Sequence, residues 1–431
     1  MTIHLYTETW IEPPASDPRV QEQFRVAENY LNSFSAIQES ISQYQGGDPI
    51  PSFATVRADP DTIISHIEPY SRLRHIVVAG NGGSIRNVWA LYQAIFEGNT
   101  AKKVHLLDST DPTGLFGLLL AEASGLSPEN TLIIAVSKSG NTENVLMETD
   151  ILHSRHYPIL IVTSQNDRSR LFQFASQRRL PCVAHPEEVG GRFTAGQINS
   201  LLPLSILDGG LTTISQVVRG LEQAYELCAS QVSLQENPAK DLAFRLFRAE
   251  TLGFCDLFFP VYCRKLMGIG ELIVQLCHET FGKDSWGISL VMASAPESQH
   301  HTNQRFFGGR RNMVGISLQV AHFEENWKLN NWLGAGEFLA LEHMGVVEEA
   351  RAQGLPWAVL TVDDLAAENI GKLIGLWQYT VVYSALLRGS NPFDQPAVEG
   401  SKSRTSKLTA QASESAPLDL DRYKTRASFH L

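Results

Sequence analysis

Short apolar runs of strand length alternate with helical segments from residue 75 onward, and this alternation limits the folds open to the chain. A first series of runs lies at residues 75–79, 104–107, 132–136 and 159–163, and a second at residues 257–262, 287–295, 313–320 and 358–362. Strands that alternate with helices form βαβ units, in which helices cover both faces of a parallel sheet. We therefore predict an α/β protein with two doubly wound parallel sheets.

Prolines and changes in polarity set the predicted domain boundaries. The first 20 residues contain two adjacent prolines and little periodicity, which indicates an arm, and residues 21–45 have a helical pattern. The segment ENP at residues 236–238 is typical of a break between domains. We predict an arm and helix at 1–50, an N-terminal domain at 51–235, a C-terminal domain at 236–402 and a loose or wrapped tail at 403–431.

Charge and composition exclude several classes of partner. The formal net charge of −11 disfavours nucleic acid and anionic membranes, because both need basic surfaces. The sequence contains neither a run of roughly 18 apolar residues nor a signal-peptide pattern, so we expect a cytoplasmic protein. The five cysteines show no CxxC spacing, which argues against a disulfide framework and a zinc ribbon.

Two of the predicted strands end in segments suited to binding phosphate. Residues 80–84 (GNGGS) let the backbone approach an anion and place Ser84 at the start of a helix. Residues 137–142 (SKSGNT) offer three hydroxyl groups, an ammonium group and backbone N–H groups at another helix start. Each segment alone is common in proteins, but both follow strands of one sheet, so the two helix starts could face a single phosphate.

A dinucleotide site is the second reading of the first segment. Gly80 and Gly82 begin a G-x-G-x-x-G pattern, and Asp108 lies near the end of the next strand. The third glycine is missing, because Ile85 occupies the position where helix and strand should pack closely. We therefore rank nucleotide binding second.

Residues 268–281 have the apolar spacing of an amphipathic helix, and Gly282 is expected to end it with a left-handed cap. Gln275 and Glu279 lie four residues apart at the edge of the apolar stripe. A carboxylate at the rim of a core is partly desolvated, which raises its pKa and favours a role as a base. Further on, His300 follows an apolar run of strand length, where catalytic groups of α/β proteins often lie.

Cations are needed to bind an anionic substrate against the negative field of the chain. Arg192 follows the glycine pair at residues 190–191, which could expose backbone and let the guanidinium reach into a cleft. Lys138, Lys283 and Lys402 are the other candidate donors.

With these motifs in their order, the chain resembles glucose-6-phosphate isomerase (phosphoglucose isomerase), a family built from two sugar-isomerase (SIS) domains of flavodoxin-like type. The most specific match is the segment NPFDQPAVEGSK at residues 391–402. The segments GGRF at 190–193, QLCHETFGK at 275–283 and QH at 299–300 also match, as do both candidate phosphate-binding segments. The resemblance spans most of residues 76–402.

The resemblance implies specific roles for residues of this chain. Glu279 would move a proton between C1 and C2 of an opened hexose 6-phosphate, Arg192 would stabilise the enediolate, and Gln275 would position the substrate. His300, contributed by the other subunit of a homodimer, would open the ring with Lys402 beside the ring oxygen. The phosphate would be held by Gly83, Ser84, Ser137, Lys138, Ser139 and Thr142. Neither a metal nor a cofactor is implied, and aldose to ketose conversion needs this set of base, acid and cation.

Several departures from the family pattern leave the substrate open. Asn81 replaces an apolar residue, residues 140–141 (GN) replace a bulkier pair, and residues 296–299 (PESQ) precede His300. If Glu297 lies near His300, it would favour the imidazolium form. A sugar-phosphate sensor without turnover, or an isomerase for another hexose phosphate such as mannose 6-phosphate, are the alternatives. A metal site at Glu279, His300 and His301 is disfavoured, because the spacing of a helical HExxH site is absent.

Overall fold

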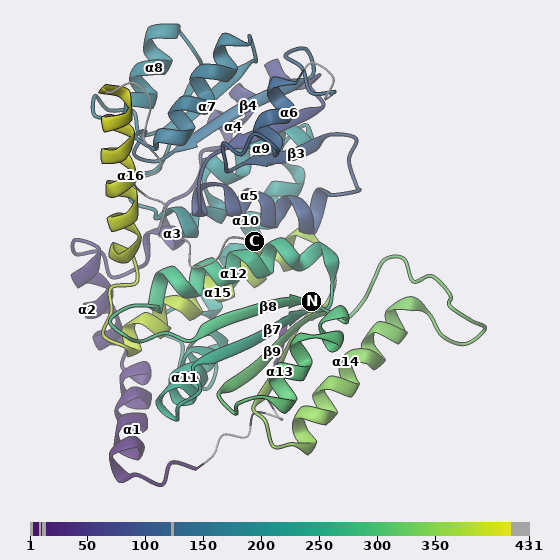
Figure 1. Cartoon of the computed structure of the whole chain (residues 1–431). Coiled ribbons are helices and arrows are strands. Elements are labelled where there is room, and N and C mark those ends of the chain that lie inside the picture. Colours follow the sequence, from purple (N-terminus) through teal and green to yellow (C-terminus); the bar gives the residue numbers. More distant parts are fainter. Residues whose placement is uncertain (1–2, 8–9, 11–13, 122–124, 415–431) are drawn as a thin grey trace, which may run out of the picture. The chain divides into compact units, whose positions relative to one another are not determined.

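The computed structural model describes residues 3–7, 10, 14–121 and 125–414 (Figure 1). These residues form two compact units, Met1–Phe393 and Asp394–Leu431. The first unit contains two sheets of five strands each. In the second unit, α16 (Pro396–Glu414) is a single helix, so the chain continues as a helix beyond residue 402 where a loose or wrapped tail was expected.

The first sheet is parallel throughout and has the strand order β3-β2-β4-β5-β6. Its strands are β2 (His75–Ala79), β3 (Lys103–Leu107), β4 (Thr131–Ser137), β5 (Ile159–Thr163) and β6 (Cys182–Ala184). This is the 2-1-3-4-5 order of flavodoxin-like folds, in which the strand order reverses between the first and third strands. The reversal therefore lies between β2 and β4, the two strands whose carboxyl ends lead into the predicted phosphate-binding segments.

The second sheet repeats the order of the first four strands, and an antiparallel strand takes the fifth position. Its order is β1-β10-β9-β7-β8, and only β1 is antiparallel to its neighbour. The strands are β1 (Ile3–Tyr6), β7 (Asp256–Val261), β8 (Ser289–Ser294), β9 (Met313–Val320) and β10 (Trp357–Val362). The structure thus confirms the predicted class of two doubly wound parallel sheets.

Helices cover both faces of each sheet, as the βαβ alternation requires (Figure 1). The segment before β2 contains α1 (Pro18–Asn32), α2 (Phe34–Tyr44), α3 (Ser52–Thr55), α4 (Pro60–Ile67) and η1 (Glu68–Tyr70). Between β2 and β7 lie α5 (Gly83–Leu91), η2 (Tyr92–Phe96), α6 (Leu115–Leu120), α7 (Glu143–Ser154), α8 (Arg170–Arg178), η3 (Gly191–Gly196), α9 (Ile198–Asp208), α10 (Thr212–Leu227) and α11 (Pro238–Thr251). The remainder of the first unit contains η4 (Arg264–Leu266), α12 (Met267–Phe281), η5 (Glu297–His300), α13 (Thr302–Gly308), α14 (Ala335–Ala352) and α15 (Ala367–Leu387).

The structure corrects three local predictions. Residues 3–6 were expected in an arm, but they form the edge strand β1 of the second sheet, paired with β10; four residues are too few to show a strand pattern. The helix predicted at 21–45 is interrupted at Ser33, whose hydroxyl accepts a hydrogen bond from the Ala36 N–H and caps α2. Gly282 ends α12 with φ −77°, not in the left-handed region.

The two sheets share one layer of buried side chains. A single apolar cluster includes Ile76, Val78 and Ile134 of the first sheet together with Phe259 and Leu318 of the second. Separate clusters lie on the opposite face of each sheet. The predicted boundary at residues 235–236 falls between the two sheets, and their independence as folding domains stays a prediction.

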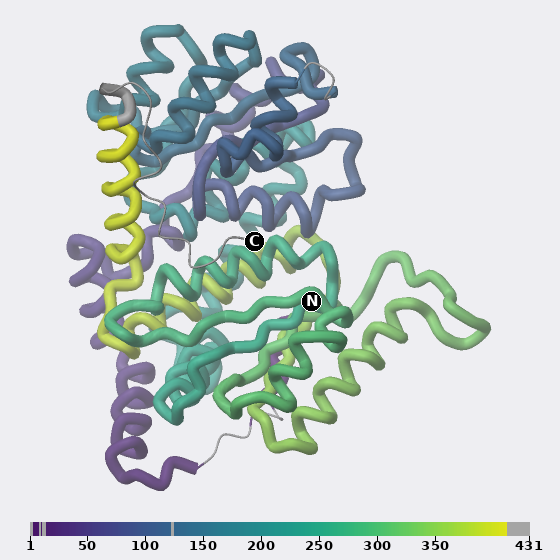
Figure 2. Tube along the Cα trace, in the orientation of Figure 1, coloured from purple at the N-terminus to yellow at the C-terminus, as the bar shows by residue number. Residues whose placement is uncertain are grey.

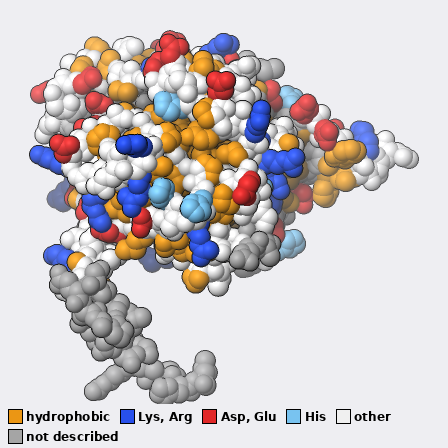
Figure 3. Space-filling model, turned by 90° about the horizontal axis from the view of Figure 1, so that it is seen from above, with side chains coloured by type: hydrophobic (Ala, Val, Ile, Leu, Met, Phe, Trp, Pro, Cys, Tyr) orange, Lys and Arg blue, Asp and Glu red, His pale blue; other side chains and the backbone are white. Residues whose placement is uncertain are grey.

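Apolar side chains are unusually exposed in the connection between β9 and α14. Trp327 and Trp332 are 73% and 75% exposed, and the exposed side chains of Phe338, Leu341 and Met344 follow on α14. This segment projects from the sheets, and Figure 3 shows hydrophobic side chains gathered on the projection at the right. Each helix in the described part of the chain, α14 included, is too short or too polar to cross a bilayer.

Candidate active site

The candidate site lies where α5 and α12 pack side by side in opposite directions (Figure 2). At one end of the pair, the Gly268 N–H at the start of α12 donates to the Gln93 Oε1 just after α5, over 2.6 Å. At the other end, a side chain at Gly82 would meet the Gln275 amide at 3.1 Å. The carboxyl-terminal half of α12, with Gln275 and Glu279, is therefore placed at the first turn of α5.

The first predicted phosphate-binding segment forms this turn and needs its glycines. Gly82 has φ +56°, in the left-handed region that other residues rarely adopt. A Cβ atom at Gly83 would lie 2.2 Å from the backbone nitrogen of Arg192, so only glycine allows this contact. The close approach brings the start of α5, with Ser84, directly against the turn that contains Arg192.

The second segment folds on itself after β4. The Ser137 Oγ lies 2.9 Å from the Thr142 Oγ1 and accepts a hydrogen bond from the Gly140 N–H at 3.1 Å. Gly140 has φ +68°, and a Cβ atom there would overlap the Ser169 hydroxyl, so this turn also requires glycine. Ser137, Ser139 and Thr142 thus lie on one short turn at the start of α7, as predicted.

Lys138 connects this turn to the segment that precedes Arg192. Its Nζ donates to the Val189 carbonyl oxygen at 3.2 Å. Burial lowers the pKa of Lys138, whereas the charges of Glu187 and Glu188 act in the opposite direction. A desolvated ammonium group gains more from binding an anion than an exposed one does, because water screens it less.

The two segments are also joined directly. The Asn81 and Asn144 side-chain amides exchange hydrogen bonds of 2.7 and 3.2 Å. Asn81 is one of the departures from the family pattern, and the structure gives it a physical role. An apolar residue at this position could not form the pair, so the asparagine fixes the spacing between the two candidate phosphate-binding turns.

Arg192 is the buried cation of the site, with 2% of its surface exposed. Its Nε donates to the Thr280 Oγ1 at 2.8 Å, and its Nη2 donates to the Pro392 carbonyl oxygen at 2.6 Å. Its Nη1 lies 3.4 Å from the Glu279 Oε2. The guanidinium is therefore held on two sides and turned toward the carboxylate of Glu279.

Gln275 lies beside this pair and has hydrogen-bonding capacity to spare. Its Nε2 donates to the Glu279 Oε1 at 2.8 Å. Its Oε1 is buried and has no hydrogen-bond partner. A buried acceptor without a partner is unfavourable, so a hydroxyl group of a bound ligand would find an acceptor ready here. The structure brings Gln275, Glu279 and Arg192 together, and their roles stay a prediction.

His300 is not part of this cluster. It ends η5 and is exposed, just after the carboxyl end of β8. Glu279 lies 12 residues beyond Met267 in α12 (279 − 267 = 12), a rise of roughly 18 Å at 1.5 Å per residue. Because α12 runs from the carboxyl end of β7 to the amino end of β8, Glu279 and His300 lie at opposite ends of the second sheet.

Three further predictions concern groups outside this cluster. Lys402 belongs to the second unit, where its Nζ donates to the Glu399 Oε1 at 2.8 Å, and its predicted role stays a prediction. Glu297 lies 2.5 Å from the Nε2 of His301, four residues on, which differs from the expected pairing with His300. Asp108, considered as part of a dinucleotide site, pairs with Arg86 at 3.5 Å.

The described residues do not form a candidate metal site. Among the described residues, no group of three or more histidine, cysteine, aspartate or glutamate side chains could hold a metal ion.

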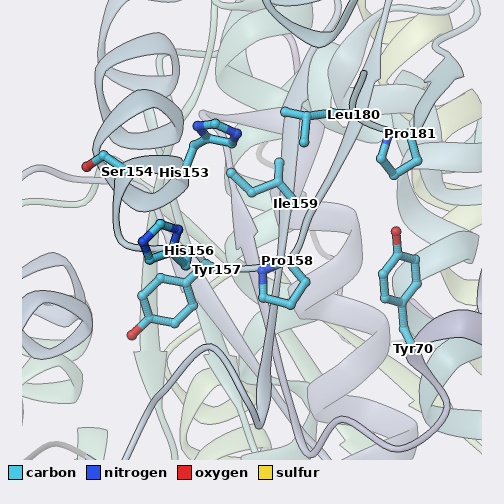
Figure 4. Close-up of a pocket in the computed structure, with 9 residues that line it drawn as sticks. All are labelled: Tyr70, His153, Ser154, His156, Tyr157, Pro158, Ile159, Leu180 and Pro181. Carbon is cyan, nitrogen blue, oxygen red and sulfur yellow. The ribbon is translucent and has the colours of Figure 1, made fainter. Parts of the chain in front are cut away.

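A surface pocket with a volume of about 500 Å³ is lined by Tyr70 and by residues around the end of α7, including His153 and His156 (Figure 4). It lies at the amino end of β5, whereas both candidate phosphate-binding segments follow carboxyl ends of strands, so we do not assign it to the site.

Several supporting residues were not predicted from the sequence. Thr280 and the Pro392 carbonyl hold Arg192, and Asn87, Thr194 and Asn199 form buried hydrogen bonds behind Ser84 and Arg192. Thr280 is adjacent to Glu279, and Asn87 lies one helical turn after Gly83. Polar residues at these spacings were the available signal, but such residues are common on the exposed faces of helices.

Comparisons with known proteins agree with this geometry. No protein-family model matches the chain. The chain is 27% identical over 368 residues to a probable glucose-6-phosphate isomerase of Haloarcula marismortui, covering 81% of each chain. It is 24% identical over 400 residues to a probable glucose-6-phosphate isomerase of Methanococcus maripaludis, covering 87% of each.

A solved structure extends this similarity to the fold. The crystal structure of a glucose-6-phosphate isomerase from Chlamydia trachomatis superposes with a TM-score of 0.77 at 17% identity, covering 98% of this chain and 90% of the other. Along most of its length, the chain is thus similar to glucose-6-phosphate isomerases, which confirms the family resemblance and the enzyme class that its motifs predict.

Proposed function

We propose that the protein interconverts glucose 6-phosphate and fructose 6-phosphate by moving a proton between C1 and C2 of the opened sugar. The observation that supports this proposal most directly is the cluster of Glu279, Arg192 and Gln275 at the first turn of α5. A base, a buried cation and an unpaired acceptor lie together beside a turn suited to binding phosphate. The similarity to proteins named glucose-6-phosphate isomerase supports the same reaction.

The proposed chemistry needs only groups that the chain supplies. Glu279 removes the proton from C2 of the open-chain aldose, and the electron pair moves toward the carbonyl to give an enediolate. The Arg192 guanidinium stabilises the negative charge of this intermediate. Glu279 then returns the proton to C1 while the O2 proton passes to O1 and the C2 carbonyl forms, which completes the ketose. Gln275 accepts a hydrogen bond from a substrate hydroxyl group and holds the open-chain sugar in position.

The phosphate is assigned to the two turns that follow β2 and β4. Backbone N–H groups at the start of α5 and the hydroxyl groups of Ser84, Ser137, Ser139 and Thr142 are suited to phosphate oxygens. Lys138 supplies a buried positive charge. The phosphate is distant from the reacting carbons, so the free energy of binding it can be used to orient C1 and C2 against Glu279.

The ring-opening acid is assigned to His300 of a second copy of the chain, acting with Lys402. Within one copy, Glu279 and His300 lie at opposite ends of the second sheet, so a homodimer with shared sites would bring the two groups together. The exposed apolar side chains of α14 favour such an association, because α14 lines a groove together with Gln299 and residues of α13, next to His300. A cytoplasmic location remains part of this proposal.

The decisive test is turnover of fructose 6-phosphate in buffer containing a chelator, with products resolved by NMR. We expect the wild type to form glucose 6-phosphate and Glu279→Gln to lose activity by on the order of a thousandfold or more while still binding substrate. Glu271→Gln is the matched control, because Glu271 lies two turns earlier on α12 and pairs with Arg86 instead of Arg192.

The outcomes separate the alternatives. Binding of hexose phosphates without turnover by the wild type would favour a sugar-phosphate sensor. Formation of mannose 6-phosphate as well as glucose 6-phosphate would indicate loose control of the face at C2. Full activity of Glu279→Gln would show that another group is the base.

A further inference from the structure

Three fully buried polar residues lie behind the site, between the phosphate-binding turn and Arg192. They are Asn87 on α5, Thr194 in η3 and Asn199 on α9, and each has 0% of its surface exposed. None of them faces the space in front of Glu279. We call these three residues the amide cluster.

The amide cluster ties two backbone segments together. The Asn87 Nδ2 donates to the Gly83 carbonyl oxygen at 2.9 Å and to the Gly191 carbonyl oxygen at 3.1 Å. The Asn199 Nδ2 donates to the Ser84 carbonyl oxygen at 2.9 Å. One segment begins α5 at the proposed phosphate site, and the other leads into Arg192.

Thr194 is the centre of the cluster. Its hydroxyl donates to the Gly191 carbonyl oxygen at 2.8 Å and accepts from the Asn199 Nδ2 at 2.9 Å and the Asn87 Nδ2 at 3.3 Å. All neighbours of the Asn87 Nδ2 are oxygen atoms, which fixes the orientation of that amide. These bonds link the start of α5 to the segment that leads into Arg192, and the relative position of the two backbone segments depends on them.

The cluster is more polar than the structure of a core requires. The Asn87 Oδ1 and the Asn199 Oδ1 are both buried without a hydrogen-bond partner. Unpaired buried acceptors oppose folding, while the N–H groups of the same amides offset part of this cost by donating to the Gly191 and Ser84 carbonyl oxygens. Two buried amides with unpaired oxygen atoms are explained if the precise spacing of the two segments matters more for activity than for stability.

We infer that the amide cluster positions Arg192 relative to the phosphate-binding turn, so that a substrate held at Ser84 meets a correctly placed guanidinium. This inference rests on the proposed function and deepens it. Thr194, Asn87 and Asn199 are positioning residues, because they act through Arg192 and touch no substrate. A small displacement of a group that stabilises the transition state lowers the rate constant more than it lowers binding.

The test compares Thr194→Val, which keeps the shape and removes the hydroxyl, with Thr194→Ser, which keeps the hydroxyl. Turnover of fructose 6-phosphate is measured at a temperature well below the thermal unfolding midpoint of each variant. We expect kcat to fall by about tenfold or more in Thr194→Val with KM changed by no more than about twofold. Thr194→Ser should retain a kcat within about threefold of the wild type.

A second pair of measurements distinguishes positioning from support of the fold. In an Arg192→Ala background, Thr194→Val should cause little additional loss of kcat, because the group it positions is already absent. If Thr194→Val does not fold, Asn199→Ser replaces it, since the smaller side chain removes the link to Ser84 without overfilling the core.

Two results would overturn the inference. One is an unchanged kcat in Thr194→Val together with a lower unfolding midpoint, which would show a structural role alone. The other is an equal loss of kcat with and without Arg192. A wild type that turns over no hexose phosphate would instead overturn the proposed function, and this inference with it.

Discussion

Glu148 should make the folded protein less stable as the pH rises toward 7, and replacing it with glutamine should remove this dependence. Glu148 lies on α7, one turn after Asn144, and has 0% of its surface exposed. Both of its carboxylate oxygens are buried. Burial raises the pKa of Glu148 from 4.5 to about 7, with the charge of Asp108 acting in the same direction and the Asn144 amide in the opposite one.

The sign and size of the effect follow from this shift. Below pH 4.5, the carboxyl group is protonated in both the folded and the unfolded chain, so it contributes no pH dependence. Between 4.5 and 7, the unfolded chain loses the proton first, and the free energy of unfolding falls. With 1.36 kcal/mol for each pKa unit, the fall between pH 5 and pH 8 amounts to about 2.5 kcal/mol.

Urea unfolding followed at several values from pH 5 to pH 8 measures this contribution. The difference in the free energy of unfolding between Glu148→Gln and the wild type should increase in favour of the variant by about 2.5 kcal/mol over this range. Taking the change across pH cancels any constant effect of the new amide. Glu226→Gln is the control, because Glu226 is exposed. Parallel curves for Glu148→Gln and the wild type would refute the reasoning.

Two further predictions concern the site itself. Inactive Glu279→Gln and His300→Ala chains, unfolded together and refolded in equal amounts, should regain about a quarter of wild-type activity. Half of the randomly formed dimers would contain one copy of each chain, and each of these dimers would have one intact site of its two. If the mixture recovers no more activity than the separate chains, both groups act within one copy. Thr280→Val should lower kcat by about tenfold, since Arg192 loses its Nε acceptor, whereas Thr280→Ser should keep most of the activity; equal rates for the two variants would exclude a role for the hydroxyl.

Much of the fold could be predicted because its signals are local. The strands at His75–Ala79, Ile159–Thr163 and Met313–Val320 have the predicted bounds, since each is mostly apolar and largely buried on both faces. The edge strand β1 (Ile3–Tyr6) could not be predicted in the same way. It is short and half-exposed, and its pairing with β10 joins residues at the two ends of the first unit.

The candidate site shows a similar division between local and distant signals. The glycines at 82 and 83 were interpreted correctly as a place where backbone approaches closely, but the approaching group was expected to be an anion. The nearest atom to a Cβ at Gly83 belongs to the backbone of Arg192. The same glycine therefore serves a contact within the protein, which no local pattern could distinguish from a contact with a ligand.

The relation of Glu279 to His300 depends on topology, and this is why sequence separation misleads. The two residues lie 21 positions apart (300 − 279 = 21), close enough in sequence to suggest neighbours. A parallel strand separates them, because β8 runs the full depth of the sheet between the end of α12 and η5. Any βαβ fold places the end of the helix and the end of the following strand on opposite edges of the sheet. For this reason we propose that one of the two groups comes from another copy of the chain.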